Sequence, residues 1–554
     1  MRPVDWLVMF SWLAFIVAYG IWRGRGSDTV RNFVLAGKTM PWYAMGLSIM
    51  ATQASAVTFI STTGQSYTDG MRFVQFYFGL PLAMVILCAT AVPIFHKANV
   101  LTAYEYLEQR FDVKTRSLVS AIFLIQRGLA AGLSLYAPSA VLSVILGWPD
   151  RVTTIMMGVL IVVYTSLGGN KAVIHSDVVQ MMLITSALVV ALTMAIHLLP
   201  AHITFGNALS LAGAAGRLNA VTTNRDWGDR YNLWSGLIGG MFLALAYFGC
   251  DQSQVQRYLS GKSIEQSRLS LLFNAMAKIP MQFFILFIGA MVFVFFTFEK
   301  PPLLFQPVEM NRIQSDPRFP EVQRRYDQAF AARQRAAEEY LQKQASGDHE
   351  LREASRLRYE AAQNDLNAAH AEGEKLAGPD FHDTNYIFLS FVTNFLPVGL
   401  VGLIIAVIFS AAMSSTSGEI NSLAAVSVID LYERHVRKGA SDHHYLNASR
   451  LATVFWGIYA VIFAQYGKSF GALIEAVNIV GSLFYGGLLG VFVLAFFFRR
   501  VGAAGAFWGV LAGEAAIFAA YLFTTISYLW FNVIGCVVVI VVGVLISYAR
   551  GKDA

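Results

Sequence analysis

The sequence predicts an all-α membrane protein that crosses the bilayer about 13 times. Of its 554 residues, 56% are hydrophobic and only 14% are charged, whereas charged residues make up about a quarter of a soluble domain. The hydrophobic residues also come in repeated runs of about 18 or more, the length that a helix needs to cross the hydrocarbon core. This composition excludes a soluble domain.

Thirteen apolar spans can be placed along the chain, and one polar insertion interrupts them. Spans 1 to 8 fall within residues 1–298, the insertion is 299–385, and spans 9 to 13 fall within 386–554. The predicted boundaries are 4–22, 42–64, 74–96, 118–146, 152–167, 176–199, 233–250, 270–298, 387–412, 449–466, 470–498, 503–525 and 530–549.

The distribution of Lys and Arg between the loops predicts the orientation. Alternate loops, beginning with 23–41 and ending with 550–554, hold 20 basic residues, whereas the short segments between them hold 7. Because basic loops stay in the cytoplasm, we expect the N-terminus outside and the C-terminus in the cytoplasm. The net charge of +6 is thereby explained without a nucleic-acid partner.

The insertion at 299–385 holds 12 basic and 16 acidic residues and is expected outside. Two segments in it, 318–344 and 350–376, repeat apolar residues every three or four positions, which predicts an antiparallel helical hairpin. At about 1.5 Å per residue the hairpin would project about 40 Å from the membrane. It is interpreted either as a solvated spacer or as a docking surface for a protein partner.

The most unusual stretch is 411–421, where hydroxyl side chains and a carboxyl interrupt the ninth span. Polar groups at this density are costly in a bilayer unless they face a partner, an ion or water. Helical spacing puts Ala411, Ser414 and Ser417 on one face, and a hard cation such as sodium prefers oxygen ligands. The alternative is that these small residues serve helix packing.

The second span is interrupted near its middle by Gln53, Ser55 and Thr58. A helix broken here would free the carbonyls of Ala51 and Ala54 for a cation and expose side chains to a solute. The alternative is a continuous helix packed through small residues. Glycines at the start of the seventh span and the sequence YFGCDQSQVQRY at its end indicate a second candidate for a broken helix.

Further polar residues lie in apolar surroundings, among them Lys278 and Glu475 as well as the three that follow. Asp177 is either an ion ligand or charge relay, or a carboxylate favoured at a helix N-terminus. Arg127 would act as a bidentate clamp for a substrate carboxylate, or would snorkel or pair with an acid. Asn478 is a further amide in the eleventh span. The cysteines all lie in apolar stretches, so neither a disulfide framework nor a zinc site is predicted.

Three motifs resemble the sodium:solute symporter family, which includes sodium-coupled sugar, monocarboxylate, proline and sialic-acid transporters. They are GGNKAVIHSDVVQ at 168–180, GCDQSQVQRYLSGKS at 249–263 and AAMSSTSGEINSLAAVSVIDLY at 411–432. The resemblance covers nearly all of the chain except 299–385. It implies the leucine-transporter fold, with spans 2 to 6 and 7 to 11 as inverted five-helix repeats.

The resemblance also implies ion ligands. The family's principal sodium site falls on the carbonyls of Ala51, Ala54 and Ala411 and the hydroxyls of Ser414 and Ser415. A second sodium site, known in some members, would use Asp177, Ser414 and Ser417. One further hydroxyl of that second site corresponds to Gly418, which has none.

The solute site implied by the resemblance is less complete. The aromatic inner gate of the sugar members matches Tyr247, but their sugar-binding Asn matches Ala244, which argues against a hexose. The family's Gln in the eleventh span is replaced by Asn478. Arg127 lies near the arginine that sialic-acid members use for a carboxylate, and LYAPSAVL at 135–142 is similar to the monocarboxylate and sialic-acid branches.

The sequence therefore predicts a sodium-coupled symporter in the plasma membrane that works by alternating access. Sodium is the co-transported ion, and membrane lipid and a small solute are the other partners. The expected solute is an organic anion such as sialic acid or a monocarboxylate, with a sugar or polyol as the alternative. A transporter-like sensor acting through a partner and a passive channel are the competing classes, and nothing predicts an enzyme. The expected solute pocket consists of Gln53, Ser55, Thr58, Gln75, Phe78, Arg127 and Asn478.

Overall fold

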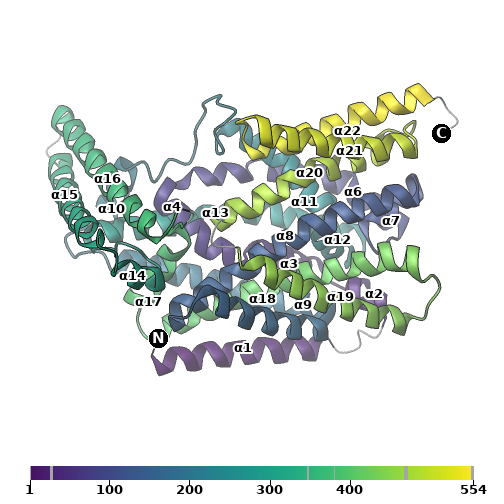
Figure 1. The fold of residues 1–554 in the computed structure, drawn as a ribbon, viewed down its shortest axis with the longest axis horizontal. Coiled ribbons are helices and arrows are strands. Elements are labelled where there is room, and N and C mark those ends of the chain that lie inside the picture. Colours follow the sequence, from purple (N-terminus) through teal and green to yellow (C-terminus); the bar gives the residue numbers. More distant parts are fainter. Residues whose placement is uncertain (1, 25–28, 346–347, 380, 467–471, 551–554) are drawn as a thin grey trace.

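The computed structural model describes residues 2–24, 29–345, 348–379, 381–466 and 472–550. The described part is 83% helix and contains no strand, which confirms the all-α prediction. Most of the long helices run side by side along the length of the molecule (Figure 1). The N-terminus and the C-terminus lie at opposite ends of this bundle.

The helices of the first half lead to the insertion. They are α1 Pro3–Arg23, α2 Val30–Leu35, α3 Trp42–Gln53, α4 Thr63–Asp69, α5 Leu80–Ala89, α6 Ala91–Ala98, α7 Ala103–Arg110, α8 Val113–Leu146, α9 Asp150–His197, α10 Phe205–Ala214, α11 Gly240–Gly249, α12 Gln252–Leu259 and α13 Ile264–Phe298. Short 3₁₀ or π segments include η2 Thr58–Thr62, η3 Met71–Tyr77 and η4 Ser235–Gly239.

The second half begins with the insertion and ends at the C-terminus. Its helices are α14 Pro307–Ile313, α15 Phe319–Ala345, α16 His349–Ala377, α17 Ile387–Phe395, α18 Leu400–Val426, α19 Asp442–Ala464, α20 Leu473–Phe497, α21 Ala503–Phe523 and α22 Tyr528–Arg550. A π segment, η6 Ser427–Val436, prolongs α18.

Ten of the described helices are long and apolar enough to cross a membrane, or up to 11 if one bent pair counts as a span. This confirms a multi-pass membrane protein, but it does not reproduce 13 separate spans. The predicted loop at 168–176 is helical, so the fifth and sixth predicted spans both belong to α9. The ninth predicted span is divided, because Leu396 and Gly399 separate α17 from α18.

The second span is broken, as one of the two sequence interpretations predicted. The helices Trp42–Gln53 and Thr58–Asp69 meet at an angle of 60°. Ala54 leaves the helical conformation, with φ −88° and ψ 53°. The Thr58 hydroxyl donates a hydrogen bond of 2.7 Å to the Gln53 carbonyl, so this side chain satisfies a backbone group that the break releases.

The seventh span is broken as well. Helix α11 ends at Gly249 and α12 begins at Gln252. Asp251 caps α12, because its carboxylate accepts hydrogen bonds from the Ser253 amide at 2.9 Å and the Ser253 hydroxyl at 2.7 Å. The second and seventh spans are therefore both interrupted, and each of these breaks exposes polar groups within the bundle.

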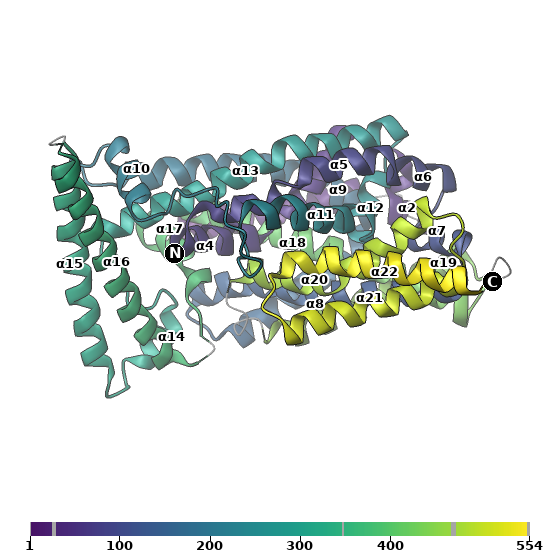
Figure 2. The ribbon, with the colours of Figure 1, turned by 90° about the horizontal axis from the view of Figure 1, so that it is seen from above.

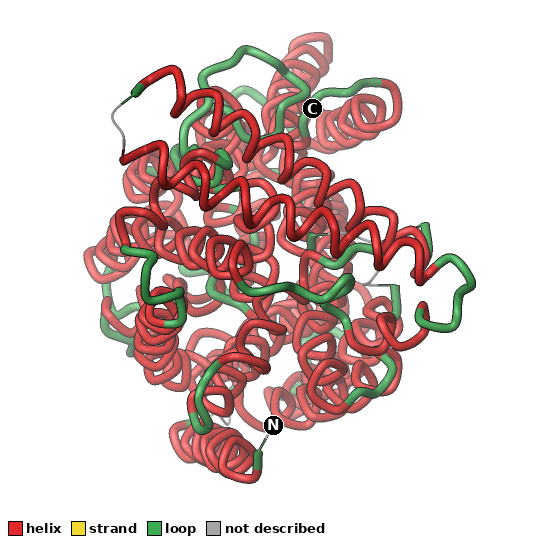
Figure 3. Tube along the Cα trace, turned by 90° about the vertical axis from the view of Figure 1, so that its left-hand side faces the viewer, coloured by secondary structure: helices red, strands yellow, loops and turns green. Residues whose placement is uncertain are grey.

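The insertion forms a hairpin of α15 and α16 that lies across one end of the bundle (Figures 2 and 3). We call this end of the molecule the hairpin end. The expectation that the hairpin projects about 40 Å away from the membrane is therefore wrong. Arg333, which is fully buried, donates to the Phe296 carbonyl at the end of α13, and Gln344 donates to the Ser210 hydroxyl of α10 at 2.7 Å. These bonds, together with buried apolar side chains, hold the hairpin against this end of the bundle.

Candidate functional site

A cavity lies between the two broken helices and the helices α8, α18 and α20. Seven residues that sequence analysis singled out line it: Gln53, Ser55, Thr58, Arg127, Tyr247, Ser415 and Asn478. The rest of the lining is mostly aromatic and aliphatic and includes Phe76, Tyr77, Ala244, Phe248 and Tyr485. A mostly apolar wall with a few convergent polar groups is typical of a small-molecule site.

Two predicted pocket residues, Gln75 and Phe78, do not line this cavity. Gln75 is fully buried, donates to the Tyr231 carbonyl at 2.8 Å and accepts from the Thr222 amide at 3.0 Å. Its amide therefore holds the loop before α11 in place. The segment at 71–77 is a 3₁₀ helix, and this turns Phe76 and Tyr77 toward the cavity in place of the two predicted residues.

Arg127 is paired with acids, which was the alternative to a free substrate clamp. Its guanidinium forms ion pairs with Asp251 and, at 3.1 Å, with Glu419, and it donates to the Tyr485 hydroxyl at 2.6 Å. The Tyr485 hydroxyl donates in turn to Asp251 at 2.9 Å. Two buried carboxylates thus engage the terminal nitrogens of Arg127, so the predicted bidentate clamp is already occupied.

Tyr247 lies over this cluster. Its ring centroid is 5.5 Å from the Arg127 guanidinium carbon, and its hydroxyl accepts a hydrogen bond of 2.7 Å from Gln254 on α12. The ring is therefore held by contacts with α8 and with α12. Tyr247 lines the cavity beside the charged cluster, whose Arg127, Glu419 and Tyr485 line it as well.

Lys278 of α13 is a fully buried basic side chain near the same cavity. Its ammonium lies 3.5 Å from the carbonyl of Gln53 and 5.1 Å from the ring centroid of Tyr77, and both of these residues line the cavity. Among the residues that the structure describes, no carboxylate lies within ion-pair distance of Lys278. Burial of an uncompensated cation is costly, so this lysine marks a place where a negative charge would be stabilised.

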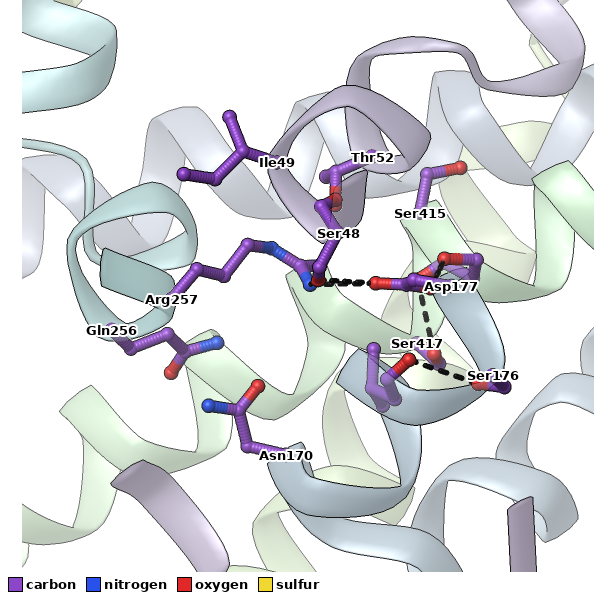
Figure 4. A network of polar contacts seen from close by, with 12 residues as sticks. Ser48, Ile49, Thr52, Asn170, Ser176, Asp177, Gln256, Arg257, Ser415 and Ser417 are labelled. Carbon is purple, nitrogen blue, oxygen red and sulfur yellow. Dashed lines mark hydrogen bonds and ion pairs between the residues drawn. The ribbon is translucent and has the colours of Figure 1, made fainter. Parts of the chain in front are cut away.

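Asp177 lies at the junction of four helices, not at a helix N-terminus (Figure 4). It is fully buried in the middle of α9. Its carboxylate accepts hydrogen bonds from Ser48 of α3 at 2.5 Å, from Ser414 of α18, and from Arg257 of α12 at 2.9 Å. One carboxylate therefore ties both broken helices to α18.

The residues predicted to form the principal sodium site are all buried, and they lie in α3 or directly after it and in α18, two helices that pack against each other. Ala51 and Ala54 lie on the last turn of α3 and at its break, while Ala411, Ser414 and Ser415 lie on α18, which packs against α3. The Ser415 hydroxyl lines the cavity and donates to the Ala411 carbonyl at 2.9 Å. Ser417 donates to the Ser414 carbonyl at 3.1 Å. These groups supply oxygen ligands of the kind that hard cations bind.

The comparison with protein families shows to which family this chain belongs. The model of the sodium:solute symporter family matches residues 33–307 and 363–513. The chain belongs to the sodium:solute symporter family. The unmatched segment, 308–362, covers α15 and the first half of α16, so the family match omits much of the hairpin.

Individual symporters are similar over nearly the whole chain. The sodium/sialic acid symporter NanT of Aliivibrio fischeri is 26% identical, over 98% of this chain and 92% of its own. The human sodium-coupled monocarboxylate transporter 1 is 27% identical, over 92% of this chain and 72% of its own. A solved structure of a Na⁺-coupled sialic acid symporter in a substrate-bound, outward-open state has a TM-score of 0.77 at 24% identity and covers 99% of this chain and 98% of its own. The relatives are transporters rather than enzymes, and this structural match shows the fold.

The partners of the buried charges in this family member were not predicted from the sequence. Arg257 and Asp251 stand inside the quoted GCDQSQVQRYLSGKS motif but received no role. Tyr485 lies in an apolar run without a local polar signal, and Ser48 precedes the polar stretch of its span. Asp251 and Arg257 had a usable signal, because a charged residue next to a broken span requires a partner.

Proposed function

We propose that this chain is a sodium-coupled symporter that imports a small organic anion by alternating access. The observation that carries the proposal is the contact of the broken helix α3–α4 with the hydroxyl-rich segment of α18, directly beside a mostly apolar cavity. An ion held between these two helices would stabilise one arrangement of them, and the cavity beside it would hold the solute.

The sodium ligands in this proposal are the carbonyls of Ala51, Ala54 and Ala411 and the hydroxyls of Ser414 and Ser415. Ser415 borders both the cavity and the Ala411 carbonyl, so ion binding and the shape of the cavity are coupled through it. Outside, where sodium is abundant, the occupied site would keep the cavity accessible. Inside, loss of the ion would release the contact of α3 with α18 and allow the solute to leave.

The charges around the cavity favour an anionic solute. Arg127 faces two carboxylates, Asp251 and Glu419, whereas Lys278 has no carboxylate partner among the described residues. These four charges sum to zero, so one sodium ion and one monoanion together keep the buried site neutral. The sialic-acid and monocarboxylate relatives, named for organic anions, support this choice. Gln53, Ser55, Thr58 and Asn478 would supply polar contacts to such a solute, and Tyr247 would be its inner gate.

We further propose that the hairpin end faces outward and that the chain has 13 spans, including the inverted five-helix repeats. The excess of basic residues in alternate loops and the opposite positions of the two termini support this orientation (Figure 1). The described cysteines, Cys88, Cys250 and Cys536, are all buried. A cysteine introduced at exposed Glu350 of α16 should therefore react with a membrane-impermeant maleimide from outside intact cells; labelling only after lysis would refute the orientation.

Uptake into proteoliposomes tests the transport proposal. Radiolabelled N-acetylneuraminate, short monocarboxylates and glucose would be offered with an inward sodium gradient or with potassium in its place. We expect one of the anions to accumulate above its external concentration only with the sodium gradient. Equilibration without accumulation would indicate a channel, and solute binding without uptake would indicate a sensor. Accumulation of glucose alone would refute the anionic solute.

A further inference from the structure

The carboxylate of Asp177 is surrounded by hydroxyl oxygens, yet a side chain already fills the space beside it. Ser48 and Arg257 donate to this carboxylate (Figure 4), and Ser414 donates to it as well. Asp177 and Arg257 are both fully buried and their ion pair measures 2.9 Å. Because arginine does not lose its proton in proteins, this positive charge is permanent.

Gly418 of α18 provides the room for the guanidinium. A Cβ atom added at Gly418 would overlap Nη2 of Arg257, so any other residue at this position would displace the guanidinium from its present place. Nε and Nη2 of Arg257 have no hydrogen-bond partner among the described residues, whereas Nη1 contacts both Ser48 and Asp177. The guanidinium of Arg257 is thus held in place by the carboxylate of Asp177 and by its close fit against Gly418.

We propose that Arg257 is a built-in cation that occupies the place of a second sodium ion at Asp177. A buried carboxylate needs a positive charge nearby, and either a mobile ion or a fixed side chain can provide it. Here Arg257 provides it in every state of the transport cycle, so the site beside Asp177, Ser414 and Ser417 neither takes up nor releases sodium. The inference rests on the proposed function and sets its stoichiometry: one sodium ion for each solute molecule.

Sodium binding to the purified full chain tests this inference without knowledge of the solute. Saturation binding of ²²Na⁺ should give one ion per protein molecule, and sodium-dependent thermal stabilisation should follow a Hill coefficient of about 1. In the double variant R257Q/G418S the fixed charge is replaced by a neutral amide and a hydroxyl is added at 418. We expect this variant to bind two sodium ions, with the Hill coefficient rising toward 2.

A matched control removes another buried arginine away from the cavity. Arg116 is fully buried and pairs with buried Asp430 at 2.6 Å. The double variant R116Q/D430N should retain one sodium ion, so a second ion in R257Q/G418S cannot be ascribed to the loss of a buried arginine in general. If R257Q/G418S does not fold, the variant G418A is used in its place. The Cβ atom added in G418A displaces the guanidinium of Arg257 without supplying an oxygen. We expect the half-saturating sodium concentration of G418A to shift at least tenfold.

The outcomes separate the inference from the proposed function. Two sodium ions bound to the unaltered chain would overturn the inference and leave sodium-coupled transport intact. One ion in R257Q/G418S, or an unchanged sodium titration in G418A, would also overturn it and leave Arg257 a structural residue. Absence of any sodium binding to the unaltered chain would refute the proposed function itself.

Discussion

Replacement of Ser415 by alanine tests whether its hydroxyl is a sodium ligand or only a structural group. Among the residues that the structure describes, its hydroxyl donates only to carbonyls of its own helix, Ala411 at 2.9 Å and Ala412 at 3.4 Å. Removal of such a bond costs about 0.5–1.5 kcal/mol at most, so S415A should fold and retain its melting temperature without sodium to within a few degrees.

Sodium affinity should respond much more strongly than stability. A polar group that contacts a charge contributes about 1.5–3 kcal/mol, and each 1.4 kcal/mol is about a tenfold change in the dissociation constant. The sodium concentration that stabilises S415A should therefore be about 10- to 100-fold higher than for the unaltered chain. The assay is a melting curve of detergent-solubilised protein at increasing NaCl, with choline chloride maintaining the ionic strength.

Ser422 provides the matched control. Its hydroxyl is also buried on α18 and donates to a carbonyl of its own helix, that of Glu419 at 2.7 Å, but it does not line the cavity. S422A should keep the sodium titration of the unaltered chain. An unchanged titration in S415A, or an equal shift in S422A, would refute the assignment of Ser415 as a sodium ligand.

Three further predictions follow from buried or paired charges. R127Q leaves Asp251 and Glu419 without a cation and should destabilise the protein by about 3–5 kcal/mol. The measurement is the melting temperature, which should fall. An unchanged melting temperature would show that the charged cluster is dispensable for stability. The substitution K278Q should weaken binding of an anionic solute at least tenfold, measured by isothermal titration calorimetry, without changing sodium-dependent stabilisation. An unchanged solute affinity would show that Lys278 is not part of the solute site. If one sodium ion moves with one monoanion, a potassium diffusion potential should leave uptake unchanged, whereas each net charge moved would change accumulation by about 50-fold per 100 mV.

The hairpin should respond to pH through His370. Burial lowers the pKa of His370, but the nearby carboxylate of Asp383 outweighs this effect, so the pKa of His370 is raised above its usual value. The 3.4 Å ion pair therefore stabilises the docked hairpin below about pH 6.5, and this contribution is lost as pH rises through the raised pKa. Protease cleavage of the hairpin should increase over that range, and H370Q should abolish the increase; cleavage independent of pH in the unaltered chain would contradict this.

Local sequence features predicted the membrane class and the positions of the unusual helices. Long apolar runs predicted the multi-pass all-α fold, because the hydrocarbon core imposes a minimum length on the helices that cross it. Polar residues in the second span indicated its break, since a bilayer tolerates them only where they meet a cavity or partner. The number of separate spans was not reproduced, because helix α9 continues through 168–176, where the sequence suggested a loop.

The partners of the buried charges depended on tertiary structure. Arg127 pairs with residues 124 and 292 positions away, and Arg257 with one 80 positions away. No local pattern specifies such pairs, because they form only when helix packing brings distant turns together. The sequence by itself determined that this chain spans a membrane and carries an oxygen-rich, broken core. Only the packing of α8 against α12 and α18 decided that Arg127 is engaged by two acids, and only the packing of α3, α9, α12 and α18 decided that the space beside Asp177 holds a guanidinium.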